Sequence, residues 1–171
     1  MGEPATGAPI VFVLGSDSDL THLESACNAL RELQVAFEVR IISAHRTPKE
    51  AADFAHNARQ AGHRCILAGA GLAAHLAGVL AAHTSLPVLG IPMPGGALNG
   101  LDALYSTVQM PGGVPVATFG IGRAGAKNAA LFAVRMLANE DPELLARLES
   151  WIQAEGDLIR AKDAEVRQQY K

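Results

Sequence analysis

The sequence predicts an α/β fold, in which a parallel sheet of five strands carries helices on both of its faces. Short, continuous apolar runs such as Ile10–Leu14 are typical of strands that are buried on both faces. A segment with helical spacing follows each run, and this alternation of strand and helix favours a parallel sheet with crossover helices. The 171 residues suffice for one such domain.

The first half of the chain supplies three of the expected strands. The run at 10–14 ends at a glycine, and apolar side chains then recur over residues 17–33 at the spacing of one helix face. Residues 35–42 form the second strand. Thr47 and Pro48 fit the N-cap and first position of a helix that reaches residue 61 and stops at Gly62. Residues 64–68 form the third strand, and the small residues at 74–83 form the next helix.

The second half of the chain continues the same alternation. Residues 87–91 are a fourth apolar run, and a turn-rich stretch at 92–100 leads into a short helix at 100–108. A fifth strand is expected at 115–119 and a helix at 124–138. Asp141 and Pro142 then open a last helix, with one charged face, that runs to about Val166.

The order of these elements predicts where a ligand binds. Five parallel strands connected in this way suggest the flavodoxin-like order 2-1-3-4-5, a three-layer sandwich with a C-terminal helix added. Strand 1 then lies between strands 2 and 3, and ligands of such folds bind at the carboxyl ends of the strands around this switch point. We therefore expect the loops after strands 1, 2 and 3 to meet. We also expect a disordered lead at 1–8 and a single domain over 9–171, whose last helix either closes that domain or packs on a neighbouring subunit.

Composition excludes several classes of function. The chain has 14 Lys and Arg against 17 Asp and Glu, a net charge of −3, so it lacks the basic excess that nucleic-acid binding requires. Residues 65–82 approach the length of a membrane span, but they are mainly Ala and Gly and include a histidine, so we expect a soluble cytoplasmic protein. Cys27 and Cys65 form no metal or redox motif. No metal-ligand spacing, Walker loop or dinucleotide motif occurs, so we expect no metal and no cofactor.

Residues suited to an anionic ligand follow the first two strands. The first loop combines a glycine, the hydroxyls of Ser16 and Ser18 and the N-terminus of a helix, which together suit a phosphate. A carboxylate such as Asp19 would repel a phosphate and fits sugar hydroxyls better, although simple helix capping also explains this loop. In the second loop, Arg46 can pair with a phosphate through two hydrogen bonds, and His45 can act as a general acid and base near neutral pH. Surface solvation is the alternative for this pair.

The third loop, residues 69–76, is nearly free of side chains before His75. Its backbone groups can line a flat ring or hold a small carboxylate, although close packing alone also explains its glycines. His75 fits a satisfied core histidine as well as a catalytic one.

Six motifs together give a specific resemblance. They are Gly-Ser-Asp-Ser-Asp at 15–19, Ser-Ala-His-Arg-Thr-Pro at 43–48, Ala-Gly-Ala-Gly-Leu-Ala-Ala-His-Leu at 68–76, Leu-Pro-Val-Leu-Gly-Ile-Pro at 86–92, Ser-Thr-Val-Gln-Met-Pro-Gly-Gly-Val-Pro-Val-Ala-Thr at 106–118 and Gly-Ala-Lys-Asn-Ala-Ala-Leu at 125–131. With these motifs in order over residues 9–155, the chain resembles the PurE family of purine biosynthesis. Within that family it is most similar to the N5-carboxyaminoimidazole ribonucleotide mutases.

The resemblance implies a homo-octamer of flavodoxin-like domains and a reaction without metal, ATP or biotin. The carboxylate on the exocyclic nitrogen of the ribonucleotide would move to ring carbon C4, by loss and recapture of CO2, with His45 as the acid and base. Arg46 and Ser43 would bind the phosphate, Asp19 the ribose, and the third loop would surround the ring and CO2. The full set of substrate-binding residues implied is Ser16, Ser18, Asp19, Ser43, Ala44, Arg46, Ala70, Gly71, His75 and Leu76.

Two residues depart from the usual pattern of these mutases. Leu72 stands where a glycine is usual, and Ala77 stands where a proline is usual. If position 72 requires a positive φ, a leucine there costs roughly 1 kcal/mol or more. The loop at 93–96 is also atypical.

Three hypotheses for the function stay open. The first is the mutase. The second is a direct carboxylase of aminoimidazole ribonucleotide. That related branch has a motif similar to Ser-Ala-His-Lys where this chain has Ser-Ala-His-Arg. The third is a non-catalytic ribonucleotide-binding homologue. The presence of His45 beside Arg46 argues against the third, because a pure binding protein needs no acid/base group.

Overall fold

The computed structural model describes residues 7–171, which fall into two compact units, one ending at Ala133 and one from Val134 to Lys171. Helix α5 (Gly122–Ala138) runs from the first unit into the second, which continues with α6 (Pro142–Gln169). The remaining elements of the first unit are β1 (Ile10–Leu14), the 3₁₀ helix η1 (Asp17–His22), α1 (Glu24–Glu32), β2 (Phe37–Ile41), α2 (Pro48–Asn57), β3 (Cys65–Ala70), α3 (Leu76–His83), β4 (Val88–Pro92), α4 (Leu101–Val108) and β5 (Ala117–Thr118).

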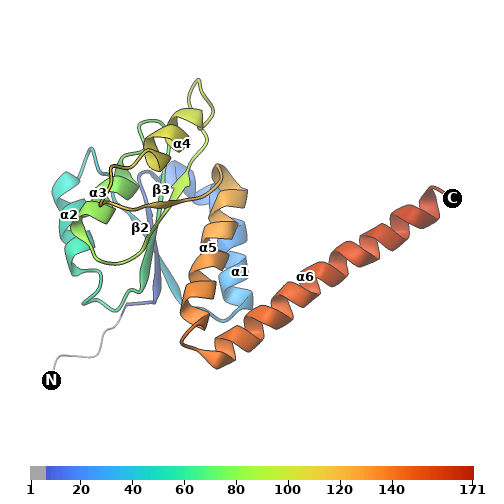
Figure 1. Ribbon diagram of the computed structural model, residues 1–171. Helices are drawn as coiled ribbons and strands as arrows, with labels where there is room; N and C mark the ends of the chain where they lie inside the picture. Colours follow the sequence, from blue (N-terminus) through green and yellow to red (C-terminus); the bar gives the residue numbers. More distant parts are fainter. Residues whose placement is uncertain (1–6) are drawn as a thin grey trace. The chain divides into compact units, whose positions relative to one another are not determined.

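The five strands form one parallel sheet in the order β2-β1-β3-β4-β5, which confirms the predicted topology (Figure 1). Strand β1 pairs with β2 on one side and with β3 on the other, with Leu14 opposite Ile41 and Gly69. Because all strands run in the same direction, their carboxyl ends lie along one edge of the sheet. The loops after β1, β2 and β3 therefore leave from neighbouring positions.

One face of the sheet packs against α2 and α3. Val11 and Val13 of β1 belong to the core cluster on this face, together with Ala51 of α2 and Leu80 of α3. These four residues have no solvent-exposed surface. Side chains alternate between the two faces of a strand, so Phe12 and its β1 neighbours of the same parity point to the opposite face.

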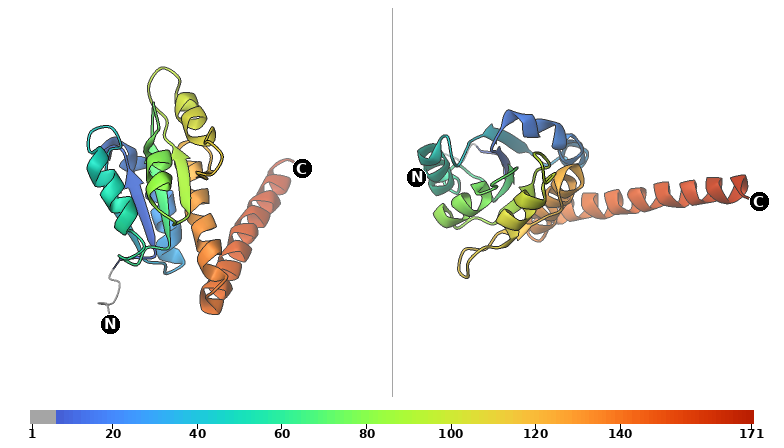
Figure 2. Two further views of the ribbon diagram at one scale, coloured as in Figure 1. Left: turned by 60° about the vertical axis from the view of Figure 1, so that its left-hand side comes forward. Right: turned by 90° about the horizontal axis from the view of Figure 1, so that it is seen from above.

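The opposite face is covered by α1 and the first turns of α5, which Figures 1 and 2 show beside each other. Ala26 and Leu30 of α1 are fully buried, as is Ala126 of α5. The guanidinium of Arg123 lies 3.3 Å from the carboxylate of Glu24, which links the starts of the two helices. The first unit thus has the three layers expected from the sequence.

Some element bounds differ from the predictions for identifiable reasons. The segment 17–33 is divided into η1 and α1, and Leu23 separates them. Strand β5 has two residues instead of five, although Phe119 still donates its N–H to the carbonyl of Gly90 at 2.9 Å. Pro115 has no N–H to give to a sheet ladder, which limits β5 on its amino-terminal side.

The ends of the chain differ in what the structure describes. Residues 1–6 of the expected disordered lead lie outside the described residues. The N–H of Gly7 donates to the carbonyl of Ala61 at 2.7 Å, and the N–H of Ala8 donates to a carboxylate oxygen of Glu38 at 2.9 Å.

In the second unit, Asp141 caps α6 by accepting from the N–H of Leu144 at 2.9 Å, next to Pro142 in the first turn. Over residues 7–171, no helix is both long and apolar enough to cross a membrane.

Candidate functional site

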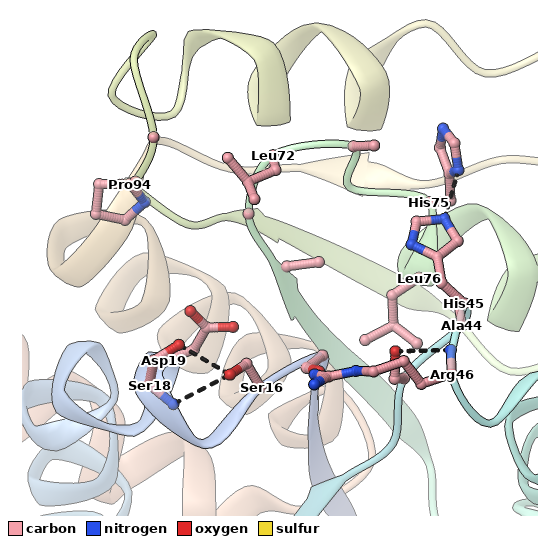
Figure 3. Close-up of a pocket in the computed structure, with 17 residues that line it drawn as sticks. Ser16, Ser18, Asp19, Ala44, His45, Arg46, Leu72, His75, Leu76 and Pro94 are labelled. Atoms are coloured by element: carbon pink, nitrogen blue, oxygen red, sulfur yellow. Dashed lines mark hydrogen bonds between the residues drawn. The ribbon is translucent and has the colours of Figure 1, made fainter.

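A cavity of about 540 Å³ lies at the carboxyl ends of β1, β2, β3 and β4 (Figure 3). This volume is in the range of sites that hold small molecules of nucleotide size. Every residue predicted for the site lines this cavity, so the three predicted loops do meet. The lining residues are Gly15, Ser16, Ser18, Asp19, Ser43, Ala44, His45, Arg46, Ala70, Gly71, Leu72, Ala73, His75, Leu76, Pro94, Gly95 and Gly96.

The loop after β1 presents hydroxyl groups at the start of η1. Ser16 is the N-cap of η1, and its Oγ accepts from the N–H of Ser18 at 3.3 Å and from the hydroxyl of Ser18 at 2.9 Å. Ser16 is half-buried, whereas Ser18 is exposed. The loop therefore does cap the helix, as one of the two alternatives expected, and it also places polar groups on the cavity.

Asp19 is the buried carboxylate of this loop, with only 9% of its surface exposed. Its burial raises the pKa of the Asp19 carboxyl above its usual range, and the nearby His22 offsets part of this effect. Hydrogen bonds from Ser16 and Ser18 also lower the pKa of Asp19, but they do not balance the loss of water on burial. Hydroxyl donors on a ligand would add to these hydrogen bonds, which fits the expectation that Asp19 binds a sugar.

We predict that Asp19→Asn weakens ligand binding while keeping or increasing the stability of the free protein at neutral pH. Since the pKa of Asp19 is raised in the folded state, its contribution to stability is full below the unfolded pKa and is lost as pH rises through the folded value. The melting temperature of the variant, relative to that of the wild type, should therefore increase as pH rises through this range. Thermal melts of both proteins across the acid range test this, and a pH-independent difference would contradict it.

The loop after β2 is fixed by its own side chains. Thr47 accepts from the N–H of Ser43 at 3.1 Å and donates its hydroxyl to the Ser43 carbonyl at 3.0 Å. The Oγ of Ser43 accepts from the N–H of Arg46 at 3.1 Å. The Arg46 guanidinium reaches across to the first loop, where Nη2 donates to the carbonyl of Gly15 at 3.0 Å. One nitrogen of the guanidinium is thus anchored at the cavity, and the others remain available to an anion.

His45 and His75 face each other across the second and third loops. Nε2 of His45 lies 2.9 Å from Nδ1 of His75, and the two rings are nearly perpendicular at 86°. At this distance one nitrogen donates a proton and the other accepts it, so the two facing nitrogens cannot both carry protons. Both residues are exposed at the cavity, which corrects the alternative that His75 is a satisfied core histidine.

The third loop has a strained residue at one of the two positions noted as unusual. Leu72 has a φ of +54°, the left-handed conformation that glycine adopts more easily. Position 72 therefore does require a positive φ, and a leucine there costs roughly 1–2 kcal/mol of stability. Ala77, the other departure, is buried in the first turn of α3 with 3% of its surface exposed.

The sequence prediction missed the fourth side of the cavity, formed by Pro94, Gly95 and Gly96 after β4. The N–H of Met93 donates to the carbonyl of Ala70 at 2.8 Å, which holds the start of this loop against the third loop. The rule that ligands bind at the carboxyl ends of parallel strands applies to β4 as well and would have included this segment. Gly15, Leu72 and Ala73 also line the cavity outside the predicted set of binding residues, although they lie within the predicted first and third loops and Leu72 was noted as unusual.

The chemistry of the lining favours an anionic ribonucleotide. No group of three or more potential metal-ligating side chains occurs within residues 7–171. The cavity combines a guanidinium, several hydroxyls, a buried carboxylate with a raised pKa and two histidines.

The comparisons with known proteins agree with this geometry. The AIR carboxylase family profile matches residues 9–157. The chain belongs to this family. Among relatives in the AIR carboxylase family, the N5-carboxyaminoimidazole ribonucleotide mutase of Mycobacterium leprae is 51% identical over 154 residues, which cover 90% of this chain and 89% of that protein. The enzyme of the same name from Escherichia coli is 49% identical over 152 residues, covering 89% and 90%.

Solved structures support the same membership of the AIR carboxylase family. The crystal structure of Treponema denticola PurE superposes with a TM-score of 0.80 at 25% identity, covering 91% of this chain and 96% of that chain. The resemblance inferred from the six motifs is therefore confirmed, and so is the predicted fold.

Proposed function

We propose that this protein converts N5-carboxyaminoimidazole ribonucleotide to 4-carboxy-5-aminoimidazole ribonucleotide in purine biosynthesis. The observation that carries the proposal is the meeting of His45 and Arg46 with the polar loop after β1 at one cavity. Relatives that are about half identical over most of the chain, and that bear the name of this mutase, support it.

The substrate lies along the cavity from the phosphate to the ring. Arg46 pairs with the phosphate, and Ser43, Ser16 and Ser18 add hydroxyl groups at this end. Asp19 accepts from the ribose hydroxyls. In this proposal, the backbone of Ala70 and Gly71 and the side chains of Ala44, His75 and Leu76, all of which line the cavity, surround the imidazole ring.

His45 moves the proton in both halves of the reaction. In the first half, the bond between the exocyclic nitrogen and the carboxylate carbon breaks, CO2 is released, and the nitrogen keeps the electron pair and takes a proton from His45. In the second half, ring carbon C4 attacks the same CO2, and C4 loses its proton to His45. The acid is thereby restored, and one group serves both steps. The contact with His75 holds the His45 ring in place between the two steps of the reaction.

A single assay tests this proposal against its two alternatives. Freshly prepared N5-carboxyaminoimidazole ribonucleotide is supplied without ATP, and formation of the C4-carboxylated product is followed. A parallel sample holds aminoimidazole ribonucleotide with bicarbonate and dissolved CO2. We expect fast product formation only in the first sample. Fast product only in the second would indicate a direct carboxylase, and binding without product in either would indicate a non-catalytic homologue.

The proposal includes a homo-oligomer, with the octamer implied by the resemblance as its specific form. Helix α6 presents Leu145, Ile152, Ile159 and Val166 at intervals of seven residues, each between 42% and 66% exposed. A seven-residue repeat of exposed apolar side chains is typical of a helix that packs on another helix. Light scattering on the full chain measures the number of subunits. We further propose that residues 9–171 act as one catalytic domain located in the cytoplasm, where Cys27 and Cys65 would stay unpaired.

A further inference from the structure

Leu72 is an apolar side chain at the rim of the cavity. It lines the cavity with 55% of its surface exposed, on the opposite side from Ser16, Ser18 and Asp19 (Figure 3). A leucine in this place is costly in two ways, because its φ is positive and because its apolar surface faces water. Strain that persists at a site edge points to a function for the residue that bears it.

The side chain of Leu72 lies directly on the loop after β4. A Cβ atom built on Gly96 would meet Cδ2 of Leu72 at 2.5 Å, so the leucine occupies the space that the bare glycine leaves. Gly96 has a φ of +61° and Gly95 a φ of +159°. Leu72 therefore packs on the segment Pro94–Gly96 at the cavity rim, and we call Leu72 together with this segment the Leu72 cover.

The backbone beneath the Leu72 cover is fixed. The hydroxyl of Ser106 on α4 accepts from the N–H of Ala74 at 3.1 Å and also contacts the Leu72 carbonyl at 3.5 Å. On the other side, the Met93 N–H is bonded to the carbonyl of Ala70. A Cβ on Gly71 would come within 3.3 Å of the Met93 carbonyl, so the third and fourth loops are in close contact. The Leu72 side chain is thus aimed at the cavity by a well-defined turn.

We propose that Leu72 closes the ring end of the cavity and retains CO2 between the two halves of the reaction. This inference rests on the proposed function, in which free CO2 exists until C4 attacks it. CO2 has no charge and no strong hydrogen-bond donor, so its retention depends on excluding water and blocking the exit. Leu72 does not contact the reacting atoms in this account. It is a positioning residue that acts through the Leu72 cover.

The fate of the labelled carboxylate carbon tests the proposal. The substrate carries ¹³C in its carbamate carbon, and the reaction runs in unlabelled bicarbonate and CO2, with the loss from an enzyme-free sample subtracted. For the wild type we expect most product to keep the label. Glycine is usual at this position in the mutases, but in this chain Leu72 fills the space beside Gly96, in a loop that is itself atypical. Leu72→Gly should leave that space open, and we expect the ratio of label lost to label retained to rise about tenfold. Because glycine relieves the strain at this φ, the melting temperature should not fall, so unfolding cannot cause the loss.

Two further variants separate closure from a general effect of mutation. Leu72→Met keeps a long apolar side chain and should retain the label nearly as well as the wild type. Leu98→Ala removes another exposed leucine of the same region, one that does not line the cavity, and should change nothing. Unchanged label retention in Leu72→Gly would overturn the proposed role of Leu72. Failure of the wild type itself to form the C4 product would instead overturn the proposed function, and this inference with it.

Discussion

Replacing His45 by asparagine is expected to lower kcat by a factor of about 10² to 10⁴, the usual contribution of a positioned general acid and base. Asparagine keeps a hydrogen-bonding group of similar reach but cannot exchange a proton at neutral pH. Since one imidazole serves both halves of the reaction, the variant should lose both the release of CO2 and the carboxylation of C4. Affinity for the ribonucleotide should change by less than about tenfold, or 1.4 kcal/mol, because Arg46 and the serines hold its phosphate end.

Steady-state turnover and a direct binding measurement on the same preparation check this prediction. His56→Asn is the matched control, because His56 is an exposed histidine of α2 that does not line the cavity. That variant should behave as the wild type in both measurements. Retained turnover in His45→Asn would remove His45 from its proposed role and leave His75, at 2.9 Å, as the next histidine to test.

The position of the site could be predicted because it follows from topology. Once the strand order 2-1-3-4-5 is inferred, the loops after β1, β2 and β3 must leave the sheet side by side. Gly15, His45 and Ala70 are far apart in sequence, yet they stand at the ends of adjacent strands. Prediction from the residues alone therefore reached the cavity, whereas the reaction itself came only from the resemblance of the six motifs.

The parts that could not be predicted depend on side-chain placement. Helical spacing does not reveal that η1 is a separate 3₁₀ turn, because both helix types bring residues three apart onto one face. The contact between His45 and His75 depends on ring orientations. The packing of Leu72 on Gly96 joins two loops whose conformations contain positive φ angles. A leucine is not the residue from which a sequence alone would predict such a turn.

Replacing Arg46 is expected to raise KM with little change in kcat. Arg46→Ala removes the charge-assisted hydrogen bonds to the phosphate, which contribute roughly 1.5–3 kcal/mol, so KM should rise by a factor of about 10 to 150. Arg46→Lys keeps the charge but loses the planar fork, and its ammonium cannot bind the phosphate and the Gly15 carbonyl in the same geometry. It should fall between alanine and the wild type. Arg40→Lys, an exposed arginine outside the cavity, should leave KM unchanged.

The lysine variant also separates binding from the choice of reaction. The direct carboxylases resemble Ser-Ala-His-Lys at this motif, so Arg46→Lys makes this chain similar to them at one residue. If Arg46 acts only on the phosphate, the variant should still use N5-carboxyaminoimidazole ribonucleotide and should not carboxylate aminoimidazole ribonucleotide with dissolved CO2. The source of CO2 would then be decided elsewhere in the cavity, such as at the third loop, where we propose that the ring binds. Direct carboxylation by Arg46→Lys would contradict this and would make residue 46 the determinant of the reaction.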